Sequence, residues 1–263
     1  MTATAPETTP VVLLHALSLH ATMWHAQEHA LRAAGHTVLA PDQRGFGGRP
    51  LGTAAPSLDV IADDLADTLD RHRAPRAVIV GSSMGGYVAM AFLRRHPERV
   101  AGLALLSARA TADSPEAAAQ RLRFAELVQD DEHRATLVEK TTPLLLGPTT
   151  RTENPDVLTR VLADAHDSPP AALAWAQRAI AARADSTDVL RGARVPALVL
   201  AGAEDALVSA DESAHVAATL PHARLVTVPG AGHLQPLETP DDVTRALLAL
   251  LDDIRTANGA PSC

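Results

Sequence analysis

The chain has 263 residues, 46% of them hydrophobic, and its formal net charge is -8 at pH 7. This length and apolar content predict one globular domain with an insertion, and not a disordered chain. The acidic balance, with no segregated basic cluster in the sequence, excludes nucleic acid and anionic membranes as expected partners, because both would repel the protein.

The two ends of the sequence bear on the compartment. The stretch MTATAPETTP lacks the basic region and apolar core of a signal peptide, and no apolar run approaches the length of a membrane span. We therefore expect a cytoplasmic protein. The only cysteine, Cys263, is the last residue, so neither an intramolecular disulfide nor a cysteine nucleophile is expected.

Short apolar runs alternate with longer amphipathic segments along the chain. Apolar runs without polar alternation are typical of parallel strands that are covered on both faces. Strand alternating with helix predicts an α/β fold with a doubly wound, mostly parallel sheet. The expected strands are residues 11–16, 36–42, 76–83, 100–108, 196–205 and 223–230, and the expected helices include 22–34, 57–73, 84–96, 209–220 and 240–257.

The strand pattern is interrupted between Arg109 and Leu190, where only alanine-rich helical stretches occur. Because a strand pattern resumes afterwards, we expect a helical cap inserted between two strands of the sheet. The predicted organisation is a core of residues 1–108 and 191–263 and a cap of residues 109–190.

The stretch VIVGSSMGGYVAM, residues 78–90, contains two adjacent serines at the junction of an expected strand and an expected helix. Ser83 has a glycine two residues before it and another two residues after it, whereas Ser82 does not. A serine at a sharp strand-to-helix turn adopts a strained backbone, and side chains at its second neighbours would collide. This spacing makes Ser83 the candidate nucleophile, with Ser82 packed at the strand end.

A serine hydroxyl needs a base within hydrogen-bond reach and an acid that orients the base. At a turn of this kind the three groups follow one another in the order serine, acid, histidine. Glu204 and Asp205 follow the strand ALVLAG, and His233 follows the last strand in a Gly-Ala-Gly loop. Such positions, beyond the carboxyl ends of parallel strands, are where these sheets bind ligands. Asp205 is favoured over Glu204 because a shorter side chain suits a fixed contact with the imidazole.

Further groups are expected around this site. Backbone N–H groups for the oxyanion are expected from Met84, after the nucleophile, and from Leu17, in the loop after the first strand. Five apolar cap side chains are expected either to line a pocket above Ser83 or to form the core of the cap. They are Phe124, Leu127, Leu144, Leu145 and Trp175.

One competing motif is HAQEH, residues 25–29, which matches the H-x-x-E-H spacing of some zinc peptidases. No third ligand is evident, so a polar face on the first helix is the preferred interpretation. No phosphate-binding glycine loop is complete either. We expect neither a metal nor an organic cofactor.

Six stretches together resemble the α/β-hydrolase superfamily, especially its small serine esterases, haloperoxidase-like perhydrolases and 3-oxoadipate enol-lactonases. They are LLHALSLHATMW, PDQRGFGGRP, VGSSMGGYVAM, HPERVAGLALL, AGAEDALV and GAGHLQPLETP. The resemblance implies that Ser83 is the nucleophile, Asp205 the acid and His233 the base, with the amides of Leu17 and Met84 as oxyanion hole. Its motifs are specific for the superfamily and only weakly specific for the substrate.

The sequence departs from this family in three places. Ala16 follows His15 where a glycine is usual, and its β-carbon is expected to narrow the oxyanion loop. Arg49 stands where a serine is common, which would place a cation near the pocket mouth. The antiparallel hairpin that usually precedes the oxyanion loop is expected to be missing, since only ten residues precede Val11. Six parallel strands are then expected, with residues 36–42 at an edge that the N-terminal segment or a second subunit of a homo-oligomer covers.

The expected function is hydrolysis of a small or medium apolar carboxylic ester or lactone through an acyl-enzyme. Two alternatives stay open at this point. One is carbon–carbon bond cleavage or a lyase-like reaction on the same triad. The other is a ligand-binding protein with vestigial catalysis, against which the complete set of three catalytic residue types argues.

Overall fold

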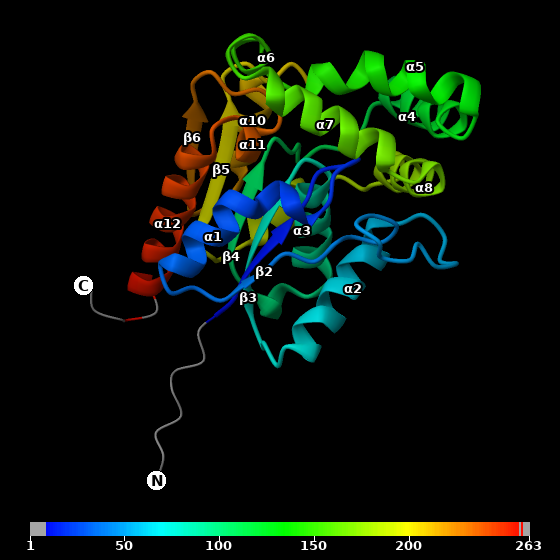
Figure 1. Cartoon of the computed structure of the whole chain (residues 1–263). Helices are drawn as coiled ribbons and strands as arrows, with labels where there is room; N and C mark the ends of the chain where they lie inside the picture. The colour runs from blue at the N-terminus through cyan, green and yellow to red at the C-terminus, as the bar shows by residue number, and fades with distance from the viewer. Residues whose placement is uncertain (1–8, 258, 260–263) are drawn as a thin grey trace.

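Six parallel strands form a single sheet in the computed structural model, which describes residues 9–257 and 259. The spatial order of the strands is β2-β1-β3-β4-β5-β6, and each neighbouring pair is parallel (Figure 1). The doubly wound parallel sheet is therefore confirmed. The strands are β1 (Val11–Leu14), β2 (Val38–Leu39), β3 (Ala77–Ser82), β4 (Val100–Leu106), β5 (Ala197–Gly202) and β6 (Ala223–Val228).

Helices cover both faces of the sheet, which explains why β1, β3 and β4 are buried along their whole length. Successive side chains of a strand point to opposite faces. In β1, Val12 and Leu14 accordingly pack with α2 (Leu58–Arg71) and α3 (Met84–Arg95). Val11 and Leu13 pack with α1 (His25–Ala33) and α12 (Pro240–Ala257). The predicted alternation of strand and helix thus produces a three-layer core.

The elements between β4 and β5 are all helical, and Figure 1 shows most of them beyond the arrowheads of the strands. Four of these helices begin with a proline, which suits the first turn because its missing N–H has no helical acceptor there. The helices are α4 (Pro115–Leu127), α5 (Asp131–Thr141), η3 (Thr142–Leu145), α6 (Pro148–Glu153), α7 (Pro155–Asp167), α8 (Pro170–Ala181) and α9 (Thr187–Gly192).

The remaining elements connect or terminate the core. Ser57 caps α2 by accepting a hydrogen bond from the backbone N–H of Asp59, as its position before the helix predicts. Ser209 and Glu212 form a reciprocal capping box at the start of α10. These elements are η1 (Ala21–Trp24), η2 (Pro97–Arg99), α10 (Ala210–Thr219) and α11 (Gln235–Glu238).

The edge strand β2 contains only two residues and pairs with β1, as expected for residues 36–42. Within the described residues, no strand precedes β1. The segment expected to cover this edge begins with residues 1–8, which lie outside the described residues, as does Cys263. Nowhere in the described residues is a helix both long and apolar enough to span a bilayer.

Candidate active site

Ser83 occupies the sharp turn between β3 and α3, with φ of 52° and ψ of -113°. This is a left-handed backbone conformation that a residue with a side chain rarely adopts. The backbone N–H of Ser83 donates a 2.8 Å hydrogen bond to the carbonyl oxygen of Leu106 on the neighbouring strand. The sheet therefore holds the turn in place and leaves the hydroxyl at the carboxyl end of β3.

The glycines around Ser83 are required by close backbone contacts. A β-carbon on Gly81 would collide with the carbonyl oxygen of Gly85, and one on Gly85 would collide with that of Leu14. These are the collisions that the spacing around Ser83 predicts. Ser82 is fully buried, and its hydroxyl has no hydrogen-bond partner among the described residues.

Three side chains that are far apart in the sequence form one hydrogen-bonded chain at this end of the sheet. The Nε2 atom of His233 lies 2.8 Å from the Oγ atom of Ser83. The Nδ1 atom of His233 lies 3.1 Å and 3.0 Å from the two carboxylate oxygens of Asp205. With its proton on Nδ1, the imidazole donates to Asp205 and accepts the hydroxyl proton of Ser83, which is the arrangement that general-base activation needs.

The carboxylate of Asp205 is almost completely buried and has donors on both oxygens. The hydroxyl of Ser107 donates over 2.6 Å, and the backbone N–H groups of Leu207 and Val208 donate over 2.8 Å and 3.1 Å. Burial alone would raise the pKa of Asp205, but the hydrogen bonds and charge of His233 and the donors of Ser107 and Leu207 outweigh it. The pKa of Asp205 therefore lies below its usual value, and the group stays ionised at neutral pH.

Glu204, the alternative acid, has a different set of partners. Its carboxylate accepts hydrogen bonds from the backbone N–H of Thr149, over 2.9 Å, and from the hydroxyl of the same residue, over 2.5 Å. Thr149 belongs to α6, so Glu204 ties the loop after β5 to the cap. Of the two adjacent carboxylates, the structure brings only Asp205 to the imidazole.

Ser107 and Gln235 extend this chain by two residues that the sequence analysis does not identify. The Nε2 atom of Gln235 donates to the hydroxyl of Ser107, over 2.6 Å, and to the carbonyl oxygen of Gly232, over 2.8 Å. The hydroxyl of Ser107 is thereby directed at Asp205. One signal was available, because Ser107 is a polar residue directly after a buried strand.

Glu238 holds the loop of the histidine against the cap. One oxygen of its carboxylate accepts hydrogen bonds from the backbone N–H groups of Gly147 and Gly232 and from the hydroxyl of Thr150. The other accepts from the backbone N–H of Leu234, over 2.9 Å. Four donors from two segments thus converge on one carboxylate. No sequence pattern marks Glu238, because its partners are brought together only by the fold.

The two expected oxyanion donors lie next to this triad. Met84 is the first residue of α3, where helix geometry provides no acceptor for its backbone N–H. Leu17 lines the same cavity as Ser83 and His233. Within residues 9–257, neither backbone N–H is engaged in a hydrogen bond. Both are therefore available to a developing oxyanion.

His15 anchors the loop that carries Leu17. Its Nδ1 atom donates to the carbonyl oxygen of Ala16, over 2.8 Å, and its Nε2 atom accepts from the backbone N–H of Gln43, over 2.9 Å. Complete burial, only partly opposed by the hydrogen bond to Ala16, lowers the pKa of His15 to about 4. The φ angle of the neighbouring Ala16 is not positive, so an alanine fits this position without backbone strain.

The free energy of unfolding is expected to fall as the pH is lowered from about 6.5 to about 4, because the unfolded chain protonates His15 and the folded protein does not. The stabilisation that neutral His15 contributes is complete above the pKa of the unfolded chain, 6.5, and is lost progressively as the pH falls towards the folded pKa of about 4. The pKa difference corresponds to about 3 kcal/mol. Urea unfolding at pH 7 and pH 4.5 should show a smaller decrease for His15→Gln than for the wild type. The exposed His29→Gln is the matched control, and equal decreases in all three proteins would contradict the expectation.

A cavity of about 370 Å³ lies above Ser83 and His233 and is lined on its other side by residues of the cap. Phe124, Leu144 and Leu145 line it. The other two cap residues, Trp175 and Leu127, do not line the cavity. The indole of Trp175 is turned away and donates to the carbonyl oxygen of Ala54, while Leu127, the last residue of α4, is half-buried outside the cavity.

Arg49 and the HAQEH stretch both form ion pairs outside the cavity. Arg49 does not line the cavity, because its guanidinium binds the carbonyl oxygen of Asp42 and the carboxylate of Asp64. In the HAQEH stretch, Glu28 forms a 2.7 Å ion pair with Arg32 on the surface of α1. The described residues contain no group of three side chains placed to hold a metal ion.

A family model described as alpha/beta hydrolase fold matches residues 9–240. A pimeloyl-[acyl-carrier protein] methyl ester esterase of Aromatoleum aromaticum is 32% identical over 93% of this chain and 97% of its own length.

Solved structures are similar over most of the chain. A malate-bound thermophilic esterase from Thermogutta terrifontis is 38% identical, with a TM-score of 0.89 over 94% of this chain and 90% of its own. The enol-lactonase from Burkholderia xenovorans is 27% identical, with a TM-score of 0.84 over 94% of this chain and 92% of its own.

Proposed function

Because the chain belongs to the alpha/beta hydrolase family, we propose that it is a serine hydrolase that cleaves a small or medium carboxylic ester or lactone through an acyl-enzyme. The observation that carries this proposal is the hydrogen-bonded chain from Ser83 through His233 to Asp205. This chain opens into a cavity that Leu17 also lines.

In the first half of the reaction, the Oγ atom of Ser83 attacks the carbonyl carbon of the substrate while Nε2 of His233 takes the hydroxyl proton. The negative charge that develops on the carbonyl oxygen is stabilised by the N–H groups of Leu17 and Met84. Asp205, which stays ionised, stabilises the imidazolium. Collapse of the tetrahedral intermediate breaks the bond to the alkoxy oxygen, which receives the proton from His233.

In the second half, a water molecule attacks the acyl carbon and gives its proton to His233. Breakdown of the second tetrahedral intermediate returns the proton to Ser83 and releases the acid. For a lactone, the alcohol stays covalently attached to the acyl part, so the product is a hydroxy acid or, from an enol lactone, an oxo acid.

The substrate class is supported by the cavity and by the relatives. The names of the relatives include a methyl ester esterase and an enol-lactonase, both of which open a carbon–oxygen bond next to a carbonyl group. The cavity of about 370 Å³ has the size of a pocket for a small molecule. Phe124, Leu144 and Leu145 supply apolar surface for the body of such a substrate.

A fluorophosphonate probe is expected to form a covalent adduct on Ser83, because a serine with a hydrogen-bonded base attacks the phosphorus centre and an ordinary serine does not. Tryptic peptide mass spectrometry locates the adduct. Ser83→Ala should abolish labelling, while Ser82→Ala should keep it. An adduct on Ser82 would contradict the proposed nucleophile. A panel of acyl esters and lactones then identifies the preferred leaving group.

A further inference from the structure

Helix α4 presents a mixed face to the active-site cavity. Its lining residues are spaced three and four apart, which places them on one stripe of the helix. They are Ala117, Gln120, Arg121 and Phe124. Two of these four side chains are polar, whereas a pocket for an entirely apolar substrate would be lined by apolar side chains.

The wall of the cavity contains two guanidinium groups and no carboxylate among the described residues that form it. Arg109 comes from the loop after β4, and its Nη2 atom donates to the carbonyl oxygen of Leu207. Arg121 comes from α4. Each of the two side chains is 24% exposed, so both are accessible from the cavity and partly shielded from bulk water.

The neighbouring acids do not neutralise this cluster. The carboxylate of Asp113 is fully buried and is shared by Arg121, at 2.5 Å, Arg183, at 2.8 Å, and Arg109, at 3.9 Å. Arg109 also forms a 2.8 Å ion pair with Glu212. Three guanidinium groups therefore share two carboxylates, and the cluster has an excess of positive charge beside the cavity.

Arg121 retains free donors. Its Nε atom donates to Asp113, and its Nη1 atom donates to Oε1 of Gln177, over 3.1 Å. Its Nη2 atom has no hydrogen bond to the described residues. A guanidinium whose other nitrogens are fixed presents such donors in a defined direction, and a carboxylate is the group that matches them best.

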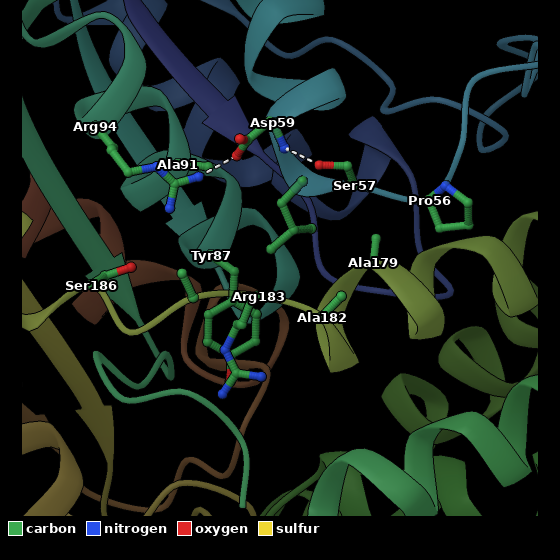
Figure 2. A pocket seen from close by; sticks show the side chains of 12 residues that line it. Pro56, Ser57, Asp59, Tyr87, Ala91, Arg94, Ala179, Ala182, Arg183 and Ser186 are labelled. Atoms are coloured by element: carbon green, nitrogen blue, oxygen red, sulfur yellow. Dashed lines mark hydrogen bonds and ion pairs between the residues drawn. The ribbon is translucent and has the colours of Figure 1, made fainter. Parts of the chain in front are cut away.

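A second cavity nearby provides a contrast. It has a volume of about 360 Å³ and is separated from the first by Tyr87, which lines both. Figure 2 shows Arg183 beside the Tyr87 ring, and its guanidinium carbon lies 4.2 Å from the ring centroid. In this second wall, Arg94 is paired with Asp59 (Figure 2). An acidic side chain thus lines the second cavity, whereas none of the described residues that line the first is acidic.

We infer that the substrate carries a free carboxylate in addition to the ester or lactone group, and that Arg121, with Arg109 beside it, binds this carboxylate in the cap. The inference rests on the proposed function, whose nucleophile and base open into the same cavity. The apolar wall around Phe124 and Leu144 then accommodates the chain between the two groups. Arg121 and Arg109 are specificity-determining residues in this assignment and take no part in bond cleavage.

The test compares release of 4-nitrophenol from two esters with the same acyl chain, the anionic mono-4-nitrophenyl ester of glutaric acid and its neutral methyl ester. The wild type is expected to show a kcat/KM roughly 10- to 100-fold higher for the anionic ester, the range of a hydrogen bond to a charged group. Arg121→Met should lower kcat/KM for the anionic ester by a similar factor and leave the neutral ester within about threefold. Arg123→Met, an exposed arginine on the same helix, is the matched control and should retain the preference.

The outcomes separate the two proposals. Equal rates for both esters in the wild type, or equal losses on both esters in Arg121→Met, would overturn the inference while the hydrolase activity stands. If neither ester is hydrolysed, binding of glutarate to Ser83→Ala by calorimetry decides. Binding that is lost with Arg121→Met in that background supports the anion site without the proposed reaction, and no binding removes the site as well.

Discussion

Replacing Ser83 by alanine is expected to lower kcat for ester hydrolysis by at least about 10³-fold, because the change removes the proposed nucleophile. The His233 imidazole and the oxyanion donors would remain, so the residual rate reports what they contribute without a nucleophile. The measurement is steady-state hydrolysis of a 4-nitrophenyl ester.

Ser82→Ala is the matched control for this prediction. Its hydroxyl is buried at the end of β3 and has no hydrogen-bond partner among the described residues, so its removal breaks no interaction with the triad. The variant should retain kcat within about threefold. Loss of activity in Ser82→Ala, with activity retained in Ser83→Ala, would identify Ser82 as the nucleophile and contradict the prediction.

The second large effect is expected from Asp205→Asn, which should lower kcat by about 10³- to 10⁴-fold. An asparagine amide presents a donor to Nδ1, favours the wrong tautomer of His233 and no longer stabilises the imidazolium. Glu204→Gln is the neighbouring isosteric change, and Glu204 binds Thr149 in the cap. It should therefore cost less than about tenfold in kcat.

Kinetics with one ester, combined with thermal unfolding to confirm that both variants fold, checks this ranking. A larger loss in Glu204→Gln than in Asp205→Asn would move the acid to Glu204. Similar losses in both would indicate that the loop after β5 acts through its position and not through one carboxylate.

The sheet and the turn of Ser83 could be predicted from the sequence because both depend on local patterns. Continuous apolar runs identify β1, β3 and β4, since these strands are buried on both faces. The glycines at 81 and 85 identify the turn, since their contacts lie within one strand-turn-helix unit and the strand beside it. The short edge strand β2 was predicted too long, because only two of its residues pair with β1.

The rest of the site depends on contacts between segments that are far apart in the chain. Ser107 and Gln235 are 128 residues apart, and Glu238 is 91 residues from Gly147. No periodicity encodes such pairs. The contacts of the cap are even harder to predict, because its alanine-rich helices are buried on several faces. The sequence therefore does not show which face of α8 carries an apolar residue such as Trp175 towards the cavity.

The hydrogen bonds of Glu238 have a consequence for how a substrate enters. The same carboxylate holds Gly147 and Thr150 of the cap and Gly232 of the histidine loop. Lifting the cap on this side would therefore disconnect the loop that positions His233, so entry and base positioning are thermodynamically coupled. A molecule that enters elsewhere along the margin of the cavity leaves these hydrogen bonds, and the position of His233, unchanged. The base is then in place before the substrate arrives, and the entropy of assembling it is lost during folding and not in each turnover.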